Sequence, residues 1–141
     1  MSLKKIGQAL KKCQESLQKL SEALRLFQAE QEVVLKSLLL DACIKRYEVA
    51  FEYAWKLFKI ASEYEGSEAP GPRPAIQEAL KFRWIEAPEF WALALDARNG
   101  SVHDYFGVSN EDYQKIMERF ARILPEALKK ISKLKSSRRG I

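Results

Sequence analysis

The sequence predicts an all-α protein, folded as a bundle of four to five helices. Apolar residues recur at spacings of three and four along most of the chain, which is the periodicity of helices that bury one face. No segment shows convincing strand-like alternation. The one clear linker, "EGSEAPGPRP" at residues 65–74, contains prolines and glycines that cannot continue a helix, and it is too short to separate two domains.

The first helix is predicted from an apolar seam that extends over nearly four heptads. Its members are Leu3, Ile6, Leu10, Cys13, Leu17, Leu20, Leu24 and Phe27. The seam must pack against another helix, either within the same chain or in a coiled coil with a second chain. A partner within the chain is the favoured alternative.

A second long helix is predicted over residues 32–63. Its first part, "VVLKSLLLDACI", is apolar on several sides and should lie centrally or lend a face to an oligomer. Its second part carries an aromatic stripe that includes Tyr47 and Phe51, which favours a core role over a cofactor site. Glu48 and Glu52 share one face and would repel each other unless a cation lies between them, which hints at a nearby arginine.

Three further helices complete the prediction. A short helix should run from Pro74 to about Trp84, and another from near Pro88 towards Arg98. The last helix should begin at Ser109, whose hydroxyl can cap the backbone, and Pro125 should bend or restart it.

Composition and hydropathy are those of an ordinary soluble domain, with 47% hydrophobic and 30% charged residues. The N-terminus has no continuous apolar region typical of a signal peptide, and no later run approaches the roughly 20 residues needed to cross a bilayer. We therefore expect a cytoplasmic protein without a membrane partner.

The formal net charge of +5 comes from the C-terminal end. Residues 1–128 carry 18 basic and 19 acidic groups, whereas residues 129–141 carry six cations and no acid. We therefore expect a helical bundle domain over residues 1–128, and a basic end of the last helix with a tail over residues 129–141. A solvated helix end, whose cations complement the helix dipole, is favoured over an RNA-binding arm.

Cysteine and histidine usage argues against a metal site. Cys13 and Cys43 lie on apolar helical faces, so a buried reduced state is favoured over a disulfide or metal ligation. The chain has a single histidine, which together with two distant cysteines cannot assemble a zinc site. No metal and no cofactor are expected.

The stretch "DARNGSVHDYF", residues 96–106, contains that histidine. On a continuous helix Arg98 and His103 would lie about 140° apart, but Gly100 can end one helix and Ser101 can cap the next. Arg98 would then end one helix, and His103 would lie in the first turn of the next. If the two side chains converge, they form a minimal site for metal-free phosphodiester chemistry. The spacing alone favours the simpler interpretation, a capped turn.

Two motifs add a family resemblance. "RNGSVHDY" resembles the R-X4-H-X-Y signature of the HEPN superfamily, the helical higher-eukaryote and prokaryote nucleotide-binding proteins, in its HepT-like branch. "IKRYEVAFEYAWK" resembles the earlier motif of the group called nucleotidyltransferase substrate-binding proteins, and "PAIQEALKFRWI" with "FWALALDARN" resembles the segment before the signature. The resemblance covers about residues 33–132, and the N-terminal helix matches only in character.

The resemblance implies an antiparallel helical bundle that forms a two-fold homodimer, in which two Arg/His pairs face one cleft. Such proteins are commonly encoded beside a minimal nucleotidyltransferase as a toxin–antitoxin pair, in which the HEPN partner is a metal-independent ribonuclease. The nucleotidyltransferase, the antitoxin, can silence that partner by attaching AMP to the tyrosine of the signature. The roles implied here are catalysis for Arg98 and His103, accessory functions for Asn99, Glu48 and Glu52, and AMP acceptance for Tyr105.

Two alternatives stay open beside the ribonuclease. The protein can be a non-catalytic subunit that gives a small nucleotidyltransferase its substrate or docking surface, so that the signature residues bind rather than cut. A purely structural helical bundle is disfavoured by the intact signature.

Overall fold

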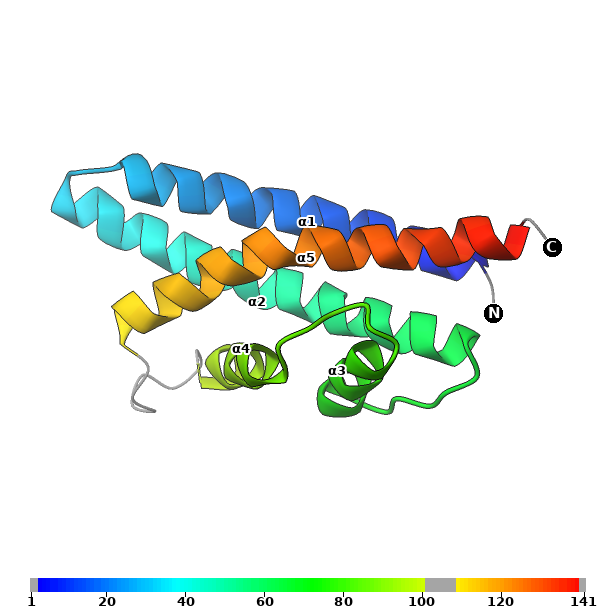
Figure 1. Cartoon of the computed structure of the whole chain (residues 1–141). Helices are drawn as coiled ribbons and strands as arrows, with labels where there is room; N and C mark the ends of the chain where they lie inside the picture. The colour runs from blue at the N-terminus through cyan, green and yellow to red at the C-terminus, as the bar shows by residue number, and fades with distance from the viewer. Residues whose placement is uncertain (1–2, 101–108, 140–141) are drawn as a thin grey trace.

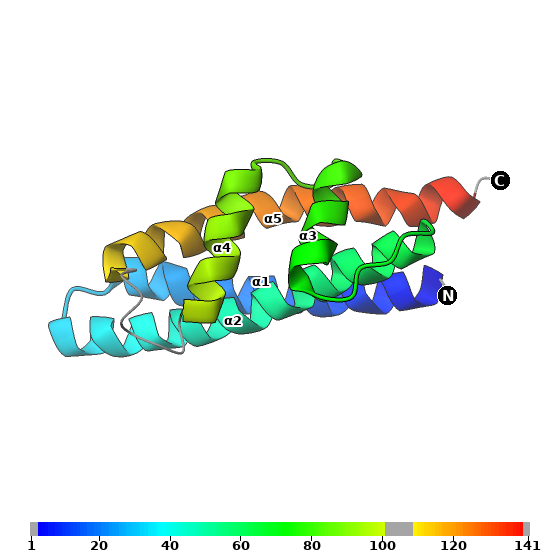
Figure 2. The same cartoon turned by 90° about the horizontal axis from the view of Figure 1, so that it is seen from below.

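The computed structural model describes residues 3–100 and 109–139, and the all-α prediction is confirmed there. The helices are α1 (Leu3–Ala29), α2 (Val33–Tyr64), α3 (Pro72–Lys81), α4 (Pro88–Gly100) and α5 (Asn110–Arg139). The long helices α1, α2 and α5 lie side by side, with α1 antiparallel to the other two (Figure 1). The short helices α3 and α4 lie on one side of the bundle (Figure 2); α3 packs against α2 and α4, and α4 packs against α5 and α2.

The apolar seam of α1 packs inside the chain. Its members from Ile6 to Phe27 are buried, and Leu3 is partly buried against the same core. The partner helices are α2 and α5. The intramolecular alternative is therefore the correct one for this seam.

The turn between α1 and α2 is fixed from both sides. The side chain of Glu32 caps α2 by accepting a hydrogen bond from the backbone N–H of Leu35 at 2.8 Å. Lys36 donates to the carbonyl oxygens of Phe27 at 2.6 Å and Glu30 at 3.3 Å, and its ammonium group lies 4.1 Å from the centre of the Phe27 ring. A lysine at this place satisfies carbonyl groups that the end of α1 leaves free.

The start of α2 is exposed, so of the two alternatives for this segment the central position is wrong, and a face lent to an oligomer stays a prediction. Its apolar side chains are between 50% and 79% exposed and are Val33, Val34, Leu35 and Leu38. The reason is that the tip of the α1–α2 hairpin extends beyond the beginning of α5, so that among the five described helices only α1 packs against it (Figure 1). None of the helices described in residues 3–100 and 109–139 is long and apolar enough to span a bilayer.

The boundaries of α3 differ from the prediction at both ends. The helix begins at Pro72, two residues before Pro74, because a proline in the first turn needs no backbone N–H. It ends at Lys81 instead of Trp84, since Arg83 adopts the left-handed conformation with φ 62°. The N–H of Arg83 bonds to the oxygen of Leu80 and that of Trp84 to the oxygen of Ala79, which is the Schellman pattern usually made by glycine.

The last two helices also extend further than expected. α4 continues through Gly100, so Arg98 lies in its last turn and does not end it. Ser109 caps α5 as predicted, because its hydroxyl accepts from the N–H of Asp112 at 3.1 Å. α5 runs without interruption past Pro125 to Arg139, which excludes a restart, and it changes direction partway along its length (Figure 1). The basic segment 129–139 is thus helical, and Ile131 within it is fully buried.

An aromatic cluster joins α2, α4 and α5 at the centre of the core. The Phe120 ring of α5 lies 5.2 Å from Tyr47 and 5.8 Å from both Phe51 and Trp91, measured between ring centroids. The rings of Tyr47 and Trp91 meet Phe120 edge to face, an arrangement that aromatic quadrupoles favour. The predicted aromatic stripe of α2 is therefore core, as expected.

Both cysteines are buried free thiols, as the sequence predicted. Burial raises the pKa of Cys13 from 9.0 to about 12. Burial also raises the pKa of Cys43 to about 11, although the nearby Arg46 opposes the shift. The folded state therefore holds its thiols protonated at a pH where the unfolded chain would already lose protons.

We expect the unfolding free energy to fall as pH rises from 9 to 12, because the folded-state pKa values lie above those of the unfolded chain. The stabilisation should be fully present below pH 9 and decline as pH approaches the folded-state values. Urea unfolding at a series of pH values tests this, and Cys13→Ala should flatten part of the slope. An identical slope in the wild type and in Cys13→Ala would contradict the assignment.

Candidate functional site

Arg98 is held against α2 by a carboxylate. Its Nη2 donates to Oε1 of Glu52 at 2.6 Å, and the two side chains are 38% and 29% exposed. Glu52 also pairs with Lys56 at 3.6 Å. Arg98 thus supplies a cation beside the two glutamates of α2, while its side chain stays partly accessible to solvent.

A buried tyrosine positions the last turns of α4 on α2. The Tyr47 hydroxyl donates to the carbonyl oxygen of Ala94 at 2.6 Å, one helical turn before Arg98. Burial raises the pKa of Tyr47 well above its usual value, the nearby Tyr113 adds to the shift, and Arg98 opposes it. Tyr47 therefore stays protonated as a donor. The bond to Ala94 and the ion pair to Glu52 together fix where Arg98 lies.

A surface pocket of about 460 Å³ adjoins this arginine. Its walls are Arg98 of α4 and six residues of α2, which are Lys45, Glu48, Val49, Glu52, Tyr53 and Lys56. Asn99 lies next to Arg98, and its side-chain oxygen accepts from Nη1 of Arg98 at a long 3.4 Å. The pocket therefore places a fixed guanidinium group beside two further cations.

A second pocket of about 420 Å³ shares Val49 and Tyr53 with the first, so the two are adjacent, and we call them together the α1–α2 groove. The second part adds Lys12, Glu15, Ser16 and Lys19 of α1 and Arg46 of α2. Arg46 is anchored there, since its Nη1 donates to the carbonyl oxygen of Lys19 at 2.9 Å. Lysines and arginines outnumber glutamates in the groove by six to three.

Four of the six predicted site residues come together in the structure, namely Glu48, Glu52, Arg98 and Asn99. His103 and Tyr105 lie outside the described residues, as do Ser101 and the turn expected around it. Lys45 and Tyr53 line the same pocket but were not among the predicted site residues. The signal for Lys45 was its spacing, because residues 45, 48, 52 and 56 fall on one helical face.

Within residues 3–100 and 109–139, no three side chains of the types His, Cys, Asp and Glu gather as metal ligands would. The geometry of the described part can instead bind an anion, through the guanidinium of Arg98 and the ammonium groups beside it.

The sequence profile of the family described as "Nucleotidyltransferase substrate binding protein like" matches residues 8–135. The chain belongs to this family. The resemblance recognised in the HepT-like signature is thereby confirmed, and the match extends into α1, which had matched only in character. The matched range contains α2, α3 and α4 completely and most of α1 and α5. It also contains the Arg98–Glu52 pair of this family member. A comparison with curated proteins gives no match.

Proposed function

We propose that this protein is the HEPN-type partner of a minimal nucleotidyltransferase and acts as a metal-independent ribonuclease, the toxin of a toxin–antitoxin pair. The observation that carries the proposal is the Arg98 guanidinium, which Glu52 fixes at 2.6 Å on a side chain that stays 38% exposed, in a pocket where two lysines offset two glutamates. A fixed, partly accessible guanidinium is suited to hold a phosphate and to stabilise the charge that develops when a phosphodiester is cut.

The α1–α2 groove supports RNA as the substrate. Its excess of cations attracts a phosphate backbone, and the partly buried Tyr53 lies where the two parts of the groove meet. An aromatic ring between cations is the usual arrangement for stacking a single-stranded base while the backbone follows the positive charges.

In the proposed reaction His103 moves a proton and Arg98 stabilises the phosphoryl charge, so that no metal is required. A two-fold dimer would double these few groups around one cleft. The exposed apolar residues at the start of α2, such as Val34 and Leu38, offer a surface that a second copy would bury. Light scattering should give a dimer at micromolar concentrations, and a monomer alone would contradict this part of the proposal.

The decisive experiment incubates the purified protein with RNA in excess EDTA, beside a His103→Ala variant. We expect cleavage by the wild type and none by the variant. Activity that EDTA abolishes and magnesium restores would refute the metal-independent mechanism, because a metal would then take the role assigned to Arg98 and His103.

Glu52 is proposed as a positioning residue, so Glu52→Gln should lower the cleavage rate by about 10-fold through loss of a charge-assisted hydrogen bond to Arg98. The fold should lose no more than about 1 kcal/mol, since the pair is partly exposed. The matched control is Glu63→Gln, which breaks the exposed pair with Lys59 on the same helix. Equal cleavage rates for the two variants would show that Glu52 does not position Arg98.

AMP transfer to Tyr105 is the proposed means of silencing. With the cognate nucleotidyltransferase and labelled ATP, the wild type should gain the mass of one AMP. Tyr105→Phe should gain none, because it lacks the acceptor hydroxyl. An AMP adduct that persists in Tyr105→Phe would assign the modification to another residue and leave the cleavage assay unaffected.

The family description favours one second candidate, a non-catalytic subunit that binds a substrate for, or docks, a small nucleotidyltransferase. The same pocket would then bind and not cut. Binding of RNA without cleavage in the EDTA experiment would select this alternative.

A further inference from the structure

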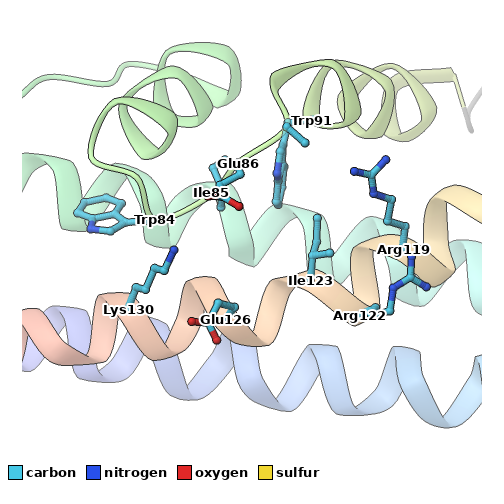
Figure 3. A pocket seen from close by; sticks show the side chains of 10 residues that line it. Trp84, Ile85, Glu86, Trp91, Arg119, Arg122, Ile123, Glu126 and Lys130 are labelled. Carbon is cyan, nitrogen blue, oxygen red and sulfur yellow. The ribbon is translucent and has the colours of Figure 1, made fainter.

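A separate pocket of about 350 Å³ lies where the α3–α4 connector, residues 82–87, faces α5 (Figure 3). This site, the α5 pocket, shares no lining residue with the α1–α2 groove. It is lined by Trp91 near the start of α4, whereas Arg98 lies seven residues further along, about 10 Å along the helix axis. The two sites can therefore be tested independently.

The indole N–H of Trp91 is the first reason to look for a ligand here. The ring is only 1% exposed, and its nitrogen has no hydrogen-bond partner among the described residues. A buried donor without an acceptor costs about 1 to 3 kcal/mol, and buried tryptophan N–H groups normally find a partner. In Figure 3 the indole extends from α4 into the space between the connector and α5. An acceptor inside the pocket would satisfy it.

Two arginines on α5 supply the positive charge. The Arg119 guanidinium lies 4.6 Å from the centre of the Phe90 ring, a cation–π contact that holds it against α4. Arg122, one turn further, forms no ion pair with any described residue. Figure 3 places both arginines on the same side of Trp91. Their planar donors match the oxygens of a phosphate better than a lysine would.

The opposite side of the pocket combines the apolar Trp84 and Ile85 of the connector with the charged Glu86, Glu126 and Lys130 (Figure 3). Lys130 donates from Nζ to the carbonyl oxygen of Arg83 at 3.2 Å, which ties α5 to the connector. Glu86 and Glu126 form no ion pair within the described part of the chain, and their carboxylates are acceptors suited to hydroxyl groups. The volume lies near the lower limit of ligand pockets, which selects a small ligand.

We propose that the α5 pocket binds a small hydroxylated phosphate monoester of the sugar phosphate class. Arg119 and Arg122 hold the phosphate, and the Trp91 indole donates to an oxygen of the ligand. The carboxylate of Glu126 accepts from a ligand hydroxyl. This site goes beyond the proposed ribonuclease, because it uses none of the residues assigned to cleavage.

The test titrates the full chain with ribose 5-phosphate and follows the tryptophan indole signals in a nitrogen–proton correlation spectrum. The chain has three tryptophans, and Trp91→Phe assigns one signal by its loss. We expect a saturable shift of the Trp91 signal with a dissociation constant below about 1 mM, and no shift of the Trp55 signal. Ribose without phosphate should cause no shift, and inorganic phosphate alone should bind more weakly.

Arg122→Ala should weaken ribose 5-phosphate binding at least about 10-fold, because it removes a charge-assisted contact. Arg73→Ala, an exposed arginine on α3 outside the pocket, should bind like the wild type. Arg98→Ala should also bind normally, whether or not the chain cleaves RNA. If the Trp91 signal does not shift at millimolar ribose 5-phosphate, the proposal is overturned, and water is the acceptor for the Trp91 indole N–H. Equal affinity of wild type and Arg122→Ala would overturn it as well.

Discussion

Replacing Arg98 by alanine is expected to lower RNA cleavage by about 100- to 1000-fold, the usual effect of removing one group that stabilises transition-state charge. RNA affinity should change little, because a single phosphate contact is a small share of a groove that carries six cations. Single-turnover cleavage rates and filter binding, measured on the same preparations, separate the two effects.

Two further variants sharpen this result. Arg98→Lys keeps the positive charge but loses the planar guanidinium group that donates to Glu52. Its cleavage rate should therefore be only slightly higher than that of Arg98→Ala. Arg73→Ala removes an arginine far from the pocket and should retain the wild-type rate. Wild-type cleavage by Arg98→Ala would show that any nuclease activity arises elsewhere.

Replacing Phe120 by alanine should destabilise the fold by about 3 to 5 kcal/mol, a large share of the stability of a typical domain. The ring is fully buried and contacts Tyr47, Phe51 and Trp91, so its loss leaves a cavity between three helices. Urea unfolding followed by circular dichroism gives the change directly.

The matched control for Phe120 is Leu93→Ala on α4, whose side chain is 54% exposed and whose replacement should change stability by less than about 0.5 kcal/mol. A loss below about 1 kcal/mol in Phe120→Ala would mean that the aromatic cluster does not hold the three helices together.

Helix boundaries could be predicted from the sequence where the residue at the boundary favours the backbone conformation that it adopts. Gly66 adopts φ 91° just after α2, and Ser109 caps α5, so both of these boundaries agreed with residue preference. The end of α3 does not agree with residue preference, because Arg83 adopts the left-handed conformation that favours glycine. Burial of the following Trp84 and Ile85 outweighs that local preference.

Only part of the candidate site could be predicted from the sequence. Repulsion between Glu48 and Glu52 pointed to an arginine, and the structure places Arg98 beside Glu52. No pattern in the sequence indicated the α5 pocket. Its residues Trp91 and Arg122 are separated by 31 positions, and the packing of α4 against α5 brings them to the same pocket. For the start of α2 the sequence left two alternatives open, a central position or a face lent to an oligomer, because its composition suits burial in either; the length of the hairpin excludes the first.

The conformation of the α3–α4 connector limits how its length can vary. Arg83 and Ala87 both have positive φ, at 62° and 63°, and each costs about 1 to 2 kcal/mol relative to glycine. Between them Trp84 and Ile85 are buried, so the core holds the connector in register at two consecutive positions. Surface loops generally accept inserted residues, but one residue added here would turn an indole or an isoleucine towards solvent. This connector therefore acts as a spacer of fixed length that sets the separation of α3 from α4.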